Sequence, residues 1–265
     1  DVTLISIVDQ LERQAVTGRP DLDAVRAQIQ AQIRRQPVLD GIRVIDHEGV
    51  TLIGDNRLGE PPLNMGDRAW FRWQRSNTSG SLHMSEPLRN KLAGSWIVSF
   101  SRRYQTAQGG FAGAVSASLP LSYLQRQLQA IDLGPGGVAE LRDEAFRLVV
   151  RHPAPAEGSV DWIGGQVLPA AGQVALAGGR REGTAEARGA ADGFERTLAW
   201  RRMSAVPLVV LVGLSTEDSL LGWRQEVAVV LAVSLVLLAV YGAGLAVAFR
   251  TLARSRRAHE RAALL

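Results

Sequence analysis

The sequence predicts an α+β chain in which two similar sheet-containing modules follow an N-terminal helical segment and precede one membrane-spanning helix. Three observations support this prediction. Apolar residues near the N-terminus recur at helical spacing, short apolar runs flank turn residues in each half of the chain, and 23 consecutive residues near the C-terminus carry no charge. A length of 265 residues is sufficient for two small domains, each with its own core.

The composition excludes several classes of protein. Hydrophobic residues make up 46% of the chain and the net charge is only +4, which excludes intrinsic disorder. The chain contains no cysteine, so it cannot form a disulfide scaffold, a thiolate zinc site, an iron–sulfur cluster or a cysteine nucleophile.

The basic charge lies at one end of the chain. Residues 250–265 contain five arginines and one glutamate, whereas basic and acidic side chains balance in the rest of the sequence. A nucleic-acid-binding protein spreads its basic residues over a folded surface, so we expect no nucleic-acid partner.

Two helices are expected within residues 1–36. A first stripe of apolar residues comprises Leu4, Val8, Leu11 and Ala15, and the segment Gly18–Pro20 interrupts it. Asp21 is a typical N-cap for a second helix, which ends before Pro37. The stripe fits a dimer-forming stalk and also fits a helix that packs on its own module.

A membrane-distal module is expected over residues 37–131. The turn residues Asp46–Gly49 lie between two apolar runs and indicate a hairpin. Further strands are expected at Leu82–Ser85, Ser95–Ser101 and Phe111–Ser118, the last in a central position, and a helix over Leu119–Ile131.

A membrane-proximal module over residues 132–224 repeats this outline. Its hairpin consists of Val138–Leu141 and Phe146–Val150, and its last strands are Glu195–Arg201 and Pro207–Gly213. The Gly-, Ala- and Arg-rich stretch Gly172–Gly193 is expected to be a loop without chemistry. Ser215 is expected to cap a final helix that continues into the membrane.

A transmembrane helix is predicted over residues 225–249. The uncharged run Val227–Phe249 would span about 34 Å as a helix, enough for the hydrocarbon core. The arginines that follow it indicate the cytoplasmic side, which makes 250–265 a cytoplasmic linker helix and places 1–226 outside. A buried core helix is the alternative. Because the outer part must be translocated, we also expect an earlier span before Asp1.

The sequence gives little sign of enzyme chemistry. Its four histidines, His47, His83, His152 and His259, are isolated, and no metal-ligand spacing occurs. The glycines of Gly134–Gly137 are not followed by a phosphate-binding motif. We therefore expect no catalytic residue, no metal and no cofactor.

These features together resemble the double Cache family, also called tandem PDC or PAS-like, which forms the extracytoplasmic sensors of bacterial transmembrane receptors. The stretches that carry the resemblance are 42–55, 66–73, 82–104, 109–124, 133–153 and 194–224. The resemblance implies a long N-terminal helix that carries two antiparallel-sheet modules, with a small molecule bound in the distal one. It also implies an output domain after the span, of the diguanylate cyclase or histidine kinase type.

The resemblance also suggests ligand-binding residues. The element Arg68-Ala-Trp70-Phe71 is similar to one that binds the carboxylate of amino-acid ligands in this family. The family's ammonium-binding Asp corresponds to Asn90, which is uncharged, and no Tyr counterpart precedes Arg68. A small carboxylate therefore fits better than an amino acid.

Other candidates for this site are second cations and polar neighbours, namely Arg72, Arg102, Arg103, His83 and Ser85. Structural roles are the alternative for each of them. If Trp70 and Phe71 lie on a strand, one of them points into the core.

The sequence thus predicts a non-enzymatic sensor that binds a small molecule, works as a homodimer and relays a conformational change through the lipid bilayer. One rival is a ligand-independent dimerisation or protein-interaction platform. The other is a membrane-anchored enzyme, which would need a cluster of titratable groups in one cleft.

Overall fold

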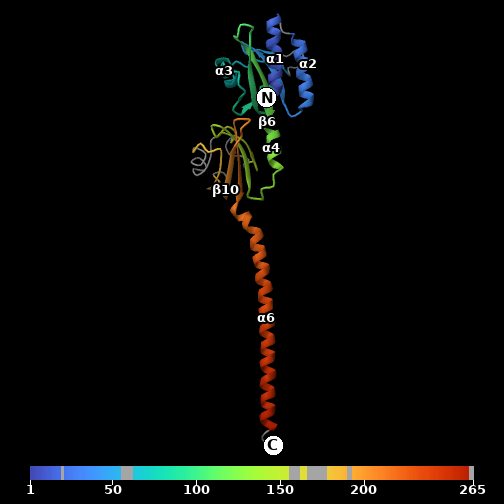
Figure 1. Ribbon diagram of the computed structural model, residues 1–265, viewed down its shortest axis with the longest axis vertical. Helices are drawn as coiled ribbons and strands as arrows, with labels where there is room; N and C mark the ends of the chain where they lie inside the picture. Colours follow the sequence, from blue (N-terminus) through green and yellow to red (C-terminus); the bar gives the residue numbers. More distant parts are fainter. Residues whose placement is uncertain (19–20, 55–61, 155–161, 166–177, 190–192, 263–265) are drawn as a thin grey trace. The chain divides into compact units, whose positions relative to one another are not determined.

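The computed structural model describes residues 1–18, 21–54, 62–154, 162–165, 178–189 and 193–262. The chain divides into two compact units, Asp1–Leu214 and Ser215–Leu265. Among the described residues, the first unit contains both sheets and the helices α1 to α4, and the second contains the last helix (Figure 1).

The helices are α1 (Val2–Thr17), α2 (Leu22–Arg35), α3 (Ala69–Ser76), α4 (Leu121–Gln129) and α6 (Thr216–Ala262). The strands of the distal sheet are β1 (Gly41–Asp46), β2 (Thr51–Ile53), β3 (His83–Met84), β4 (Leu88–Arg89), β5 (Trp96–Gln105) and β6 (Phe111–Pro120). The strands of the proximal sheet are β7 (Val138–Asp143), β8 (Leu148–His152), β9 (Glu182–Arg188), β10 (Glu195–Arg202) and β11 (Leu208–Ser215).

The distal sheet is antiparallel, with the order β2-β1-β6-β5-β3 and with β4 paired to β5. The predicted hairpin is present as β1 and β2, and the Asp46 carboxylate closes its turn by accepting the backbone N–H groups of Glu48 and Val50. Strand β6 is central, as its small and β-branched residues predict.

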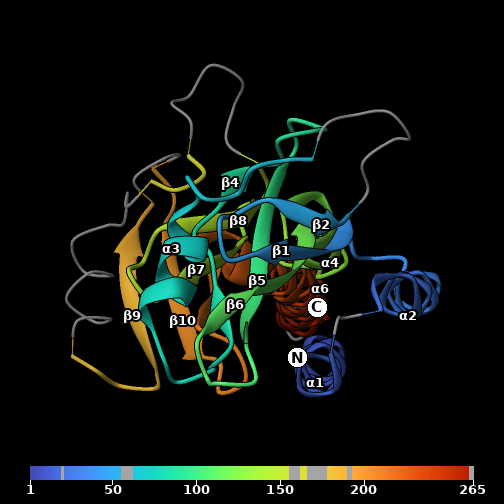
Figure 2. The ribbon, with the colours of Figure 1, turned by 90° about the horizontal axis from the view of Figure 1, so that it is seen from above.

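Helices α1 and α2 pack on one face of this sheet (Figure 2). Their buried side chains are Leu4, Ile7, Leu11, Val25 and Ile29, which join Ile42, Val44 and Val115 of the sheet in one core cluster. Asp21 caps α2 as predicted, since its carboxylate accepts the N–H groups of Asp23 and Ala24. The expected long N-terminal helix is thus two helices, and the apolar stripe of α1 packs on its own module.

Helix α3 packs on the opposite face of the distal sheet (Figure 2). Placing Trp70 and Phe71 on a strand, with one side chain inside, was wrong, because both are buried in a helix at 4% and 0% exposure. Together with Gln74 they occupy positions i, i+1 and i+4, which share one face of a helix.

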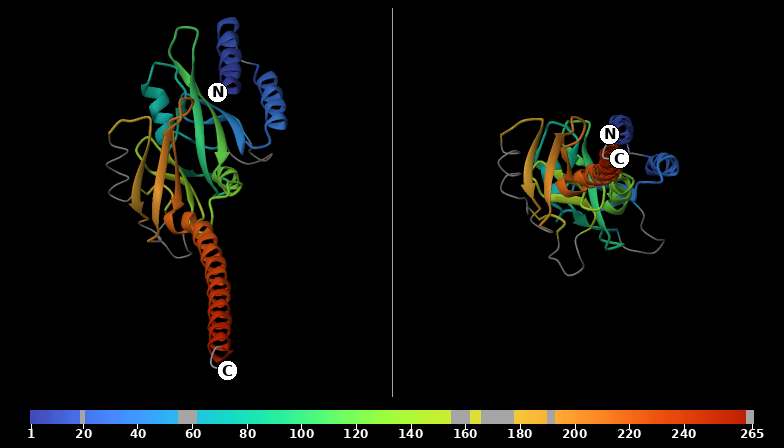
Figure 3. Two further views of the ribbon diagram at one scale, coloured as in Figure 1. Left: turned by 60° about the horizontal axis from the view of Figure 1, so that its bottom comes forward. Right: turned by 90° about the horizontal axis from the view of Figure 1, so that it is seen from below.

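The proximal sheet is also antiparallel, with the order β8-β7-β11-β10-β9 (Figure 3). The predicted hairpin is present as β7 and β8. The expected loop at Gly172–Gly193 was wrong for its described part, because residues 182–188 form β9. Residues 172–177 and 190–192 of that stretch lie outside the described residues.

A shared apolar core joins the two modules within the first unit. Its distal members are Met84, Val98, Leu121 and Leu128, and its proximal members are Ala139, Leu141, Val149, Val150 and Leu208. Because these side chains form one cluster, the modules are packed against each other rather than linked only by the chain.

The second unit consists of α6. The Ser215 hydroxyl caps this helix as predicted, because it accepts the Asp218 N–H at 3.4 Å. Glu217 and Asp218 in the first turn suit the helix dipole. Residues Glu226–Leu245 form a candidate membrane span by length and composition, with a mean hydropathy of 2.5 and no part buried. This exposure argues against the alternative of a buried core helix.

The packing of α1 can be tested with two isoleucines of the same helix. Ile7 is fully buried, whereas Ile5 is 37% exposed. Ile7→Ala is expected to lower the free energy of unfolding by about 2–5 kcal/mol, because it removes buried methylenes and leaves a cavity. Ile5→Ala is the control and should cost clearly less. Denaturant unfolding measures both, and equal losses would contradict this packing of α1.

Candidate ligand site

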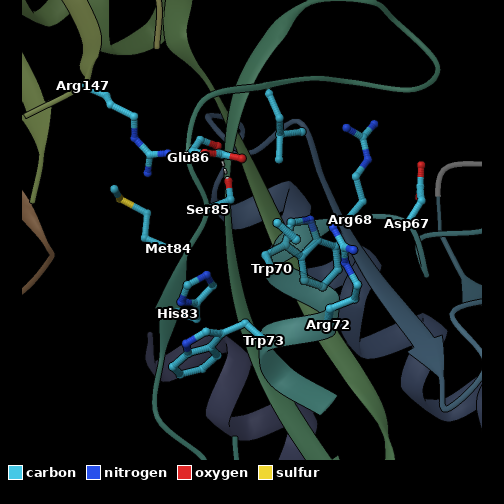
Figure 4. Close-up of a pocket in the computed structure, with 12 residues that line it drawn as sticks. Asp67, Arg68, Trp70, Arg72, Trp73, His83, Met84, Ser85, Glu86 and Arg147 are labelled. Carbon is cyan, nitrogen blue, oxygen red and sulfur yellow. Dashed lines mark hydrogen bonds and ion pairs between the residues drawn. The ribbon is translucent and has the colours of Figure 1, made fainter. Parts of the chain in front are cut away.

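A pocket of about 460 Å³ lies in the distal module between α3 and the segment that contains β3 and β4 (Figure 4). Twelve residues line it: Asp67, Arg68, Ala69, Trp70, Arg72, Trp73, His83, Met84, Ser85, Glu86, Leu88 and Arg147. Five of the predicted site residues are among them, namely Arg68, Trp70, Arg72, His83 and Ser85.

Helix α3 places two arginines at this pocket. Arg68 is the N-cap residue of α3 and Arg72 lies four residues later, which puts the two side chains on the same side of the helix. The Arg68 guanidinium donates a hydrogen bond of 2.9 Å to the Arg89 carbonyl oxygen, which fixes its direction. Arg72 is exposed and forms no hydrogen bond or ion pair with any described residue. One cation at the pocket is therefore available to an anion.

An aromatic wall forms another side of the pocket. The rings of Trp73 and His83 stack with centroids 4.2 Å apart and an interplanar angle of 16°. The backbone of His83 is paired with that of Ser101 across β3 and β5, which fixes the point from which the imidazole projects. Burial lowers the pKa of His83 below its ordinary value of 6.5, so the ring is neutral at pH 7.

Both acidic side chains of the lining have cationic partners. Asp67 accepts a hydrogen bond of 2.7 Å from the Lys91 ammonium group, which lowers the pKa of this carboxyl group. Glu86 forms an ion pair with Arg147. These acids are therefore already neutralised and do not compensate the charge of Arg72.

Ser85 lines the pocket, but its hydroxyl group is used within the fold. It accepts the Ser99 N–H at 2.8 Å and donates to the Glu86 carbonyl oxygen at 2.7 Å. The hydroxyl group thus already donates one hydrogen bond and accepts another, and Ser85 as a whole is only 3% exposed. Ser85 positions Glu86 in this structure.

Asn90 does not line this pocket. Its amide oxygen accepts the N–H groups of Leu92 and Ala93, and its amide nitrogen donates to the Asp40 carboxylate. It lines a second, much smaller cavity of about 20 Å³, together with Arg68, Trp70 and Arg43. That volume is enough for about one water molecule.

The remaining candidates also lie elsewhere. The Arg102 guanidinium binds the Asp1 carboxylate at 2.7 Å and donates to the Gly80 carbonyl oxygen, at the side of the module where α1 begins. Arg103 donates to the Asn77 carbonyl oxygen and lies over the Phe111 ring. The structure places neither of them at the pocket.

Among the lining residues that were not singled out from the sequence, Trp73, Glu86 and Arg147 matter most for the chemistry of the site. Trp73 lies two residues after the Arg68–Phe71 element and three after Trp70, so its i, i+3 spacing from Trp70 was a usable signal. Glu86 is adjacent to Ser85. Arg147 belongs to the proximal module and is far from the other lining residues in sequence, so no local pattern indicates its place.

The fold resembles solved sensor structures over most of the chain, although no family model matches the sequence and no curated protein matches it closely. The extracellular domain of rpHK1S-Z16, described as a histidine kinase, is 28% identical, with a TM-score of 0.69. The match covers 84% of this chain and 88% of that domain.

Ligand-binding domains of chemoreceptors are similar in fold at lower identity. The PctB domain of Pseudomonas aeruginosa, solved with L-Arg, is 14% identical, with a TM-score of 0.61 and coverage of 82% and 86%. The CtaA domain of Pseudomonas fluorescens, solved with L-isoleucine, is 17% identical, with a TM-score of 0.59 and coverage of 82% and 83%.

The chain has the double Cache sensor fold. The segment is a sensor region and not a catalytic domain, because the 28% identical structure that it matches across both modules is the extracellular domain of a histidine kinase. With the candidate span in α6, these findings support a membrane-anchored receptor whose sensor lies outside the cytoplasm.

The stacked histidine predicts a pH dependence of stability. Because the pKa of His83 is lower in the folded chain than its ordinary value of 6.5, the unfolded chain takes up a proton first as the pH falls. The free energy of unfolding should therefore fall as the pH drops through 6.5 toward the folded pKa. Thermal unfolding between pH 5 and 8 measures this, and His83→Gln should show a shallower decline. His47→Gln, at an exposed position, should behave as the unmodified chain does. Equal slopes for all three would contradict the prediction.

Proposed function

We propose that this chain is the extracytoplasmic sensor of a membrane receptor and that it binds a small carboxylate in the pocket beside α3. The observation that carries the proposal is the pair Arg68 and Arg72 on one side of α3, with Arg72 unpaired among the described residues. A guanidinium group binds a carboxylate through two parallel hydrogen bonds. The neutral stack of Trp73 and His83 forms a wall of the same pocket without competing for the charge of Arg72.

A carboxylate without an ammonium group suits this lining better than an amino acid. The similar chemoreceptor domains were solved with amino acids such as L-Arg and L-isoleucine. Here the two acids that could hold an ammonium group, Asp67 and Glu86, already pair with Lys91 and Arg147. The ammonium group of an amino acid would have to displace one of those cations from its acid, whereas a carboxylate is attracted by Arg72, the free donors of Arg68 and the other cations of the lining.

The signal is carried from the pocket toward the membrane by packed elements. The β3 residue Met84 lines the pocket and also belongs to the core shared with the proximal module. Strand β11 of that module ends at Ser215, where α6 begins. The bound ligand would shift the equilibrium between two packings of a homodimer. The size of that shift is set by the difference between the ligand's affinities for the two packings. An output domain beyond residue 265, a histidine kinase or a diguanylate cyclase, would respond.

Carboxylate binding can be tested by thermal unfolding of the 265-residue chain in detergent micelles. The panel comprises acetate, pyruvate, succinate, citrate, amino acids, amines and purines. A ligand at 100 times its Kd adds about 2.7 kcal/mol of stability, which gives a clear rise in Tm. A carboxylate is expected to give this rise, and Arg68→Ala or Arg72→Ala should abolish it. Arg126→Ala on α4, which is exposed and outside the pocket, is the control.

The outcomes separate the proposal from its rivals. A carboxylate that still stabilises both arginine variants would show that it binds elsewhere. No stabilisation by any member of the panel would overturn the proposed ligand and favour the dimerisation or protein-interaction platform.

The orientation in the membrane can be tested because the chain contains no cysteine. We propose that residues 1–226 lie outside the cytoplasm and 250–265 inside, since arginines follow the span directly. Ser79→Cys, at an exposed position, should react with a membrane-impermeant maleimide in intact spheroplasts. Ser255→Cys should react only after the membrane is opened. The reverse pattern would overturn this orientation.

A further inference from the structure

The pocket of the distal module is completed by a residue of the proximal module. Arg147 lies between β7 and β8, yet its side chain lines the same pocket as Arg68 and Arg72. Figure 4 shows its guanidinium group at the side of Glu86, with Arg68 and Arg72 across the pocket near Trp70. Cations from both modules thus face this pocket.

Asp143 of β7 holds Arg147 in place. One oxygen of its carboxylate accepts the Arg147 backbone N–H at 2.9 Å, and the other accepts the guanidinium Nε–H at 2.6 Å. The Asp143 side chain is 7% exposed, whereas that of Arg147 is 33% exposed. A buried acid in the proximal module therefore orients a half-exposed cation toward the distal module.

Glu86 holds the same guanidinium group from the distal side. Its carboxylate accepts a hydrogen bond from the Nη1 group of Arg147. The backbone around Glu86 is fixed in turn, because Ser85 donates to the Glu86 carbonyl oxygen and pairs with Ser99 of β5. One guanidinium group is thus shared by two carboxylates, one from each module.

We infer that Arg147 is the positioning residue through which the occupied pocket acts on the proximal module. The inference rests on the proposed function, because it assigns the pocket an anionic ligand. A ligand carboxylate and Glu86 compete for the donors of Arg147, while Asp143 keeps its hold through Nε. Ligand binding and the contact between modules then depend on one group, so each changes the free energy of the other by the same amount.

The coupling can first be tested without ligand, by amide hydrogen exchange of the 265-residue chain in detergent micelles. Asp143→Asn weakens the support of Arg147 but touches no residue of the distal module in the described contacts. The Ser85 N–H donates to the Ser99 carbonyl oxygen, and the Ser99 N–H donates to the Ser85 hydroxyl oxygen. We expect both amides to exchange several-fold faster in this variant. Glu182→Gln, which breaks an exposed ion pair elsewhere in the proximal module, should leave them unchanged. Unchanged exchange in Asp143→Asn would overturn the inference.

The second test measures the affinity of whichever carboxylate in the panel binds most tightly, by calorimetry on the same chain. Arg147→Gln is expected to weaken binding about tenfold, the effect of losing one charge-assisted hydrogen bond. The affinity of Arg147→Lys should lie between those of the unmodified chain and Arg147→Gln, because lysine keeps the charge but not the two parallel donors of the guanidinium group. Asp143→Asn should weaken binding a few-fold, although Asp143 does not line the pocket.

These results distinguish the two proposals. If Arg68→Ala abolishes binding and Arg147→Gln leaves it unchanged, the sensor function stands and the role of Arg147 is overturned. If no carboxylate binds the unmodified chain, the proposed function fails, and the exchange measurement alone decides whether Arg147 couples the modules.

Discussion

The packing of α3 on the distal sheet is the constraint on which the candidate site depends. The rings of Trp70 and Phe71 meet edge to face with centroids 5.9 Å apart, and the rings of Phe71 and Phe111 of β6 do so at 5.8 Å. These ring contacts fix how this face of the helix packs on the sheet. Once positions 70, 71 and 74 are buried, positions 68 and 72 are directed away from the core by helix geometry alone. Core packing therefore sets where the two cations stand at the pocket, and the hydrogen bond to the Arg89 carbonyl oxygen then fixes the direction of Arg68.

Much of the fold could be predicted because the signals were local. The hairpin at Asp46–Gly49, the cap at Asp21 and the uncharged run after Glu226 each depend on a few neighbouring residues whose chemistry has one favourable arrangement. The α3 helix was missed because the two adjacent aromatic residues of this short segment were interpreted as the alternating inward and outward side chains of a strand. Its true signal was the i, i+1, i+4 spacing of Trp70, Phe71 and Gln74, which only a helix can bury on one side.

The remaining errors arose where a residue's role depends on a distant partner. Strand β9 alternates exposed charged or polar residues with small ones, and the small ones are needed because Trp200 of β10 fills the space beside them. A Cβ atom at Gly183 would lie 2.5 Å from the Trp200 ring. Ser85 was predicted from its place near His83, but its hydroxyl group is engaged by Ser99 and Glu86. No local sequence pattern could reveal the contact of Gly183 with Trp200 or the hydrogen bonds of Ser85. Nor could it show that Arg147 of the proximal module lines the pocket.

The core shared by the modules explains why a contact as exposed as Glu86–Arg147 can matter. An ion pair of this exposure contributes little to stability by itself. Here it lies beside a close-packed cluster that contains Met84 from the pocket and Leu141 from β7, and such a core responds to a change at one edge by shifting as a unit. In the proposed relay, the ion pair would select between two packings of the modules that differ little in free energy. A weak, polar and ligand-accessible contact is better suited to that role than a strong buried one, because the small binding energy of a carboxylate is enough to alter it.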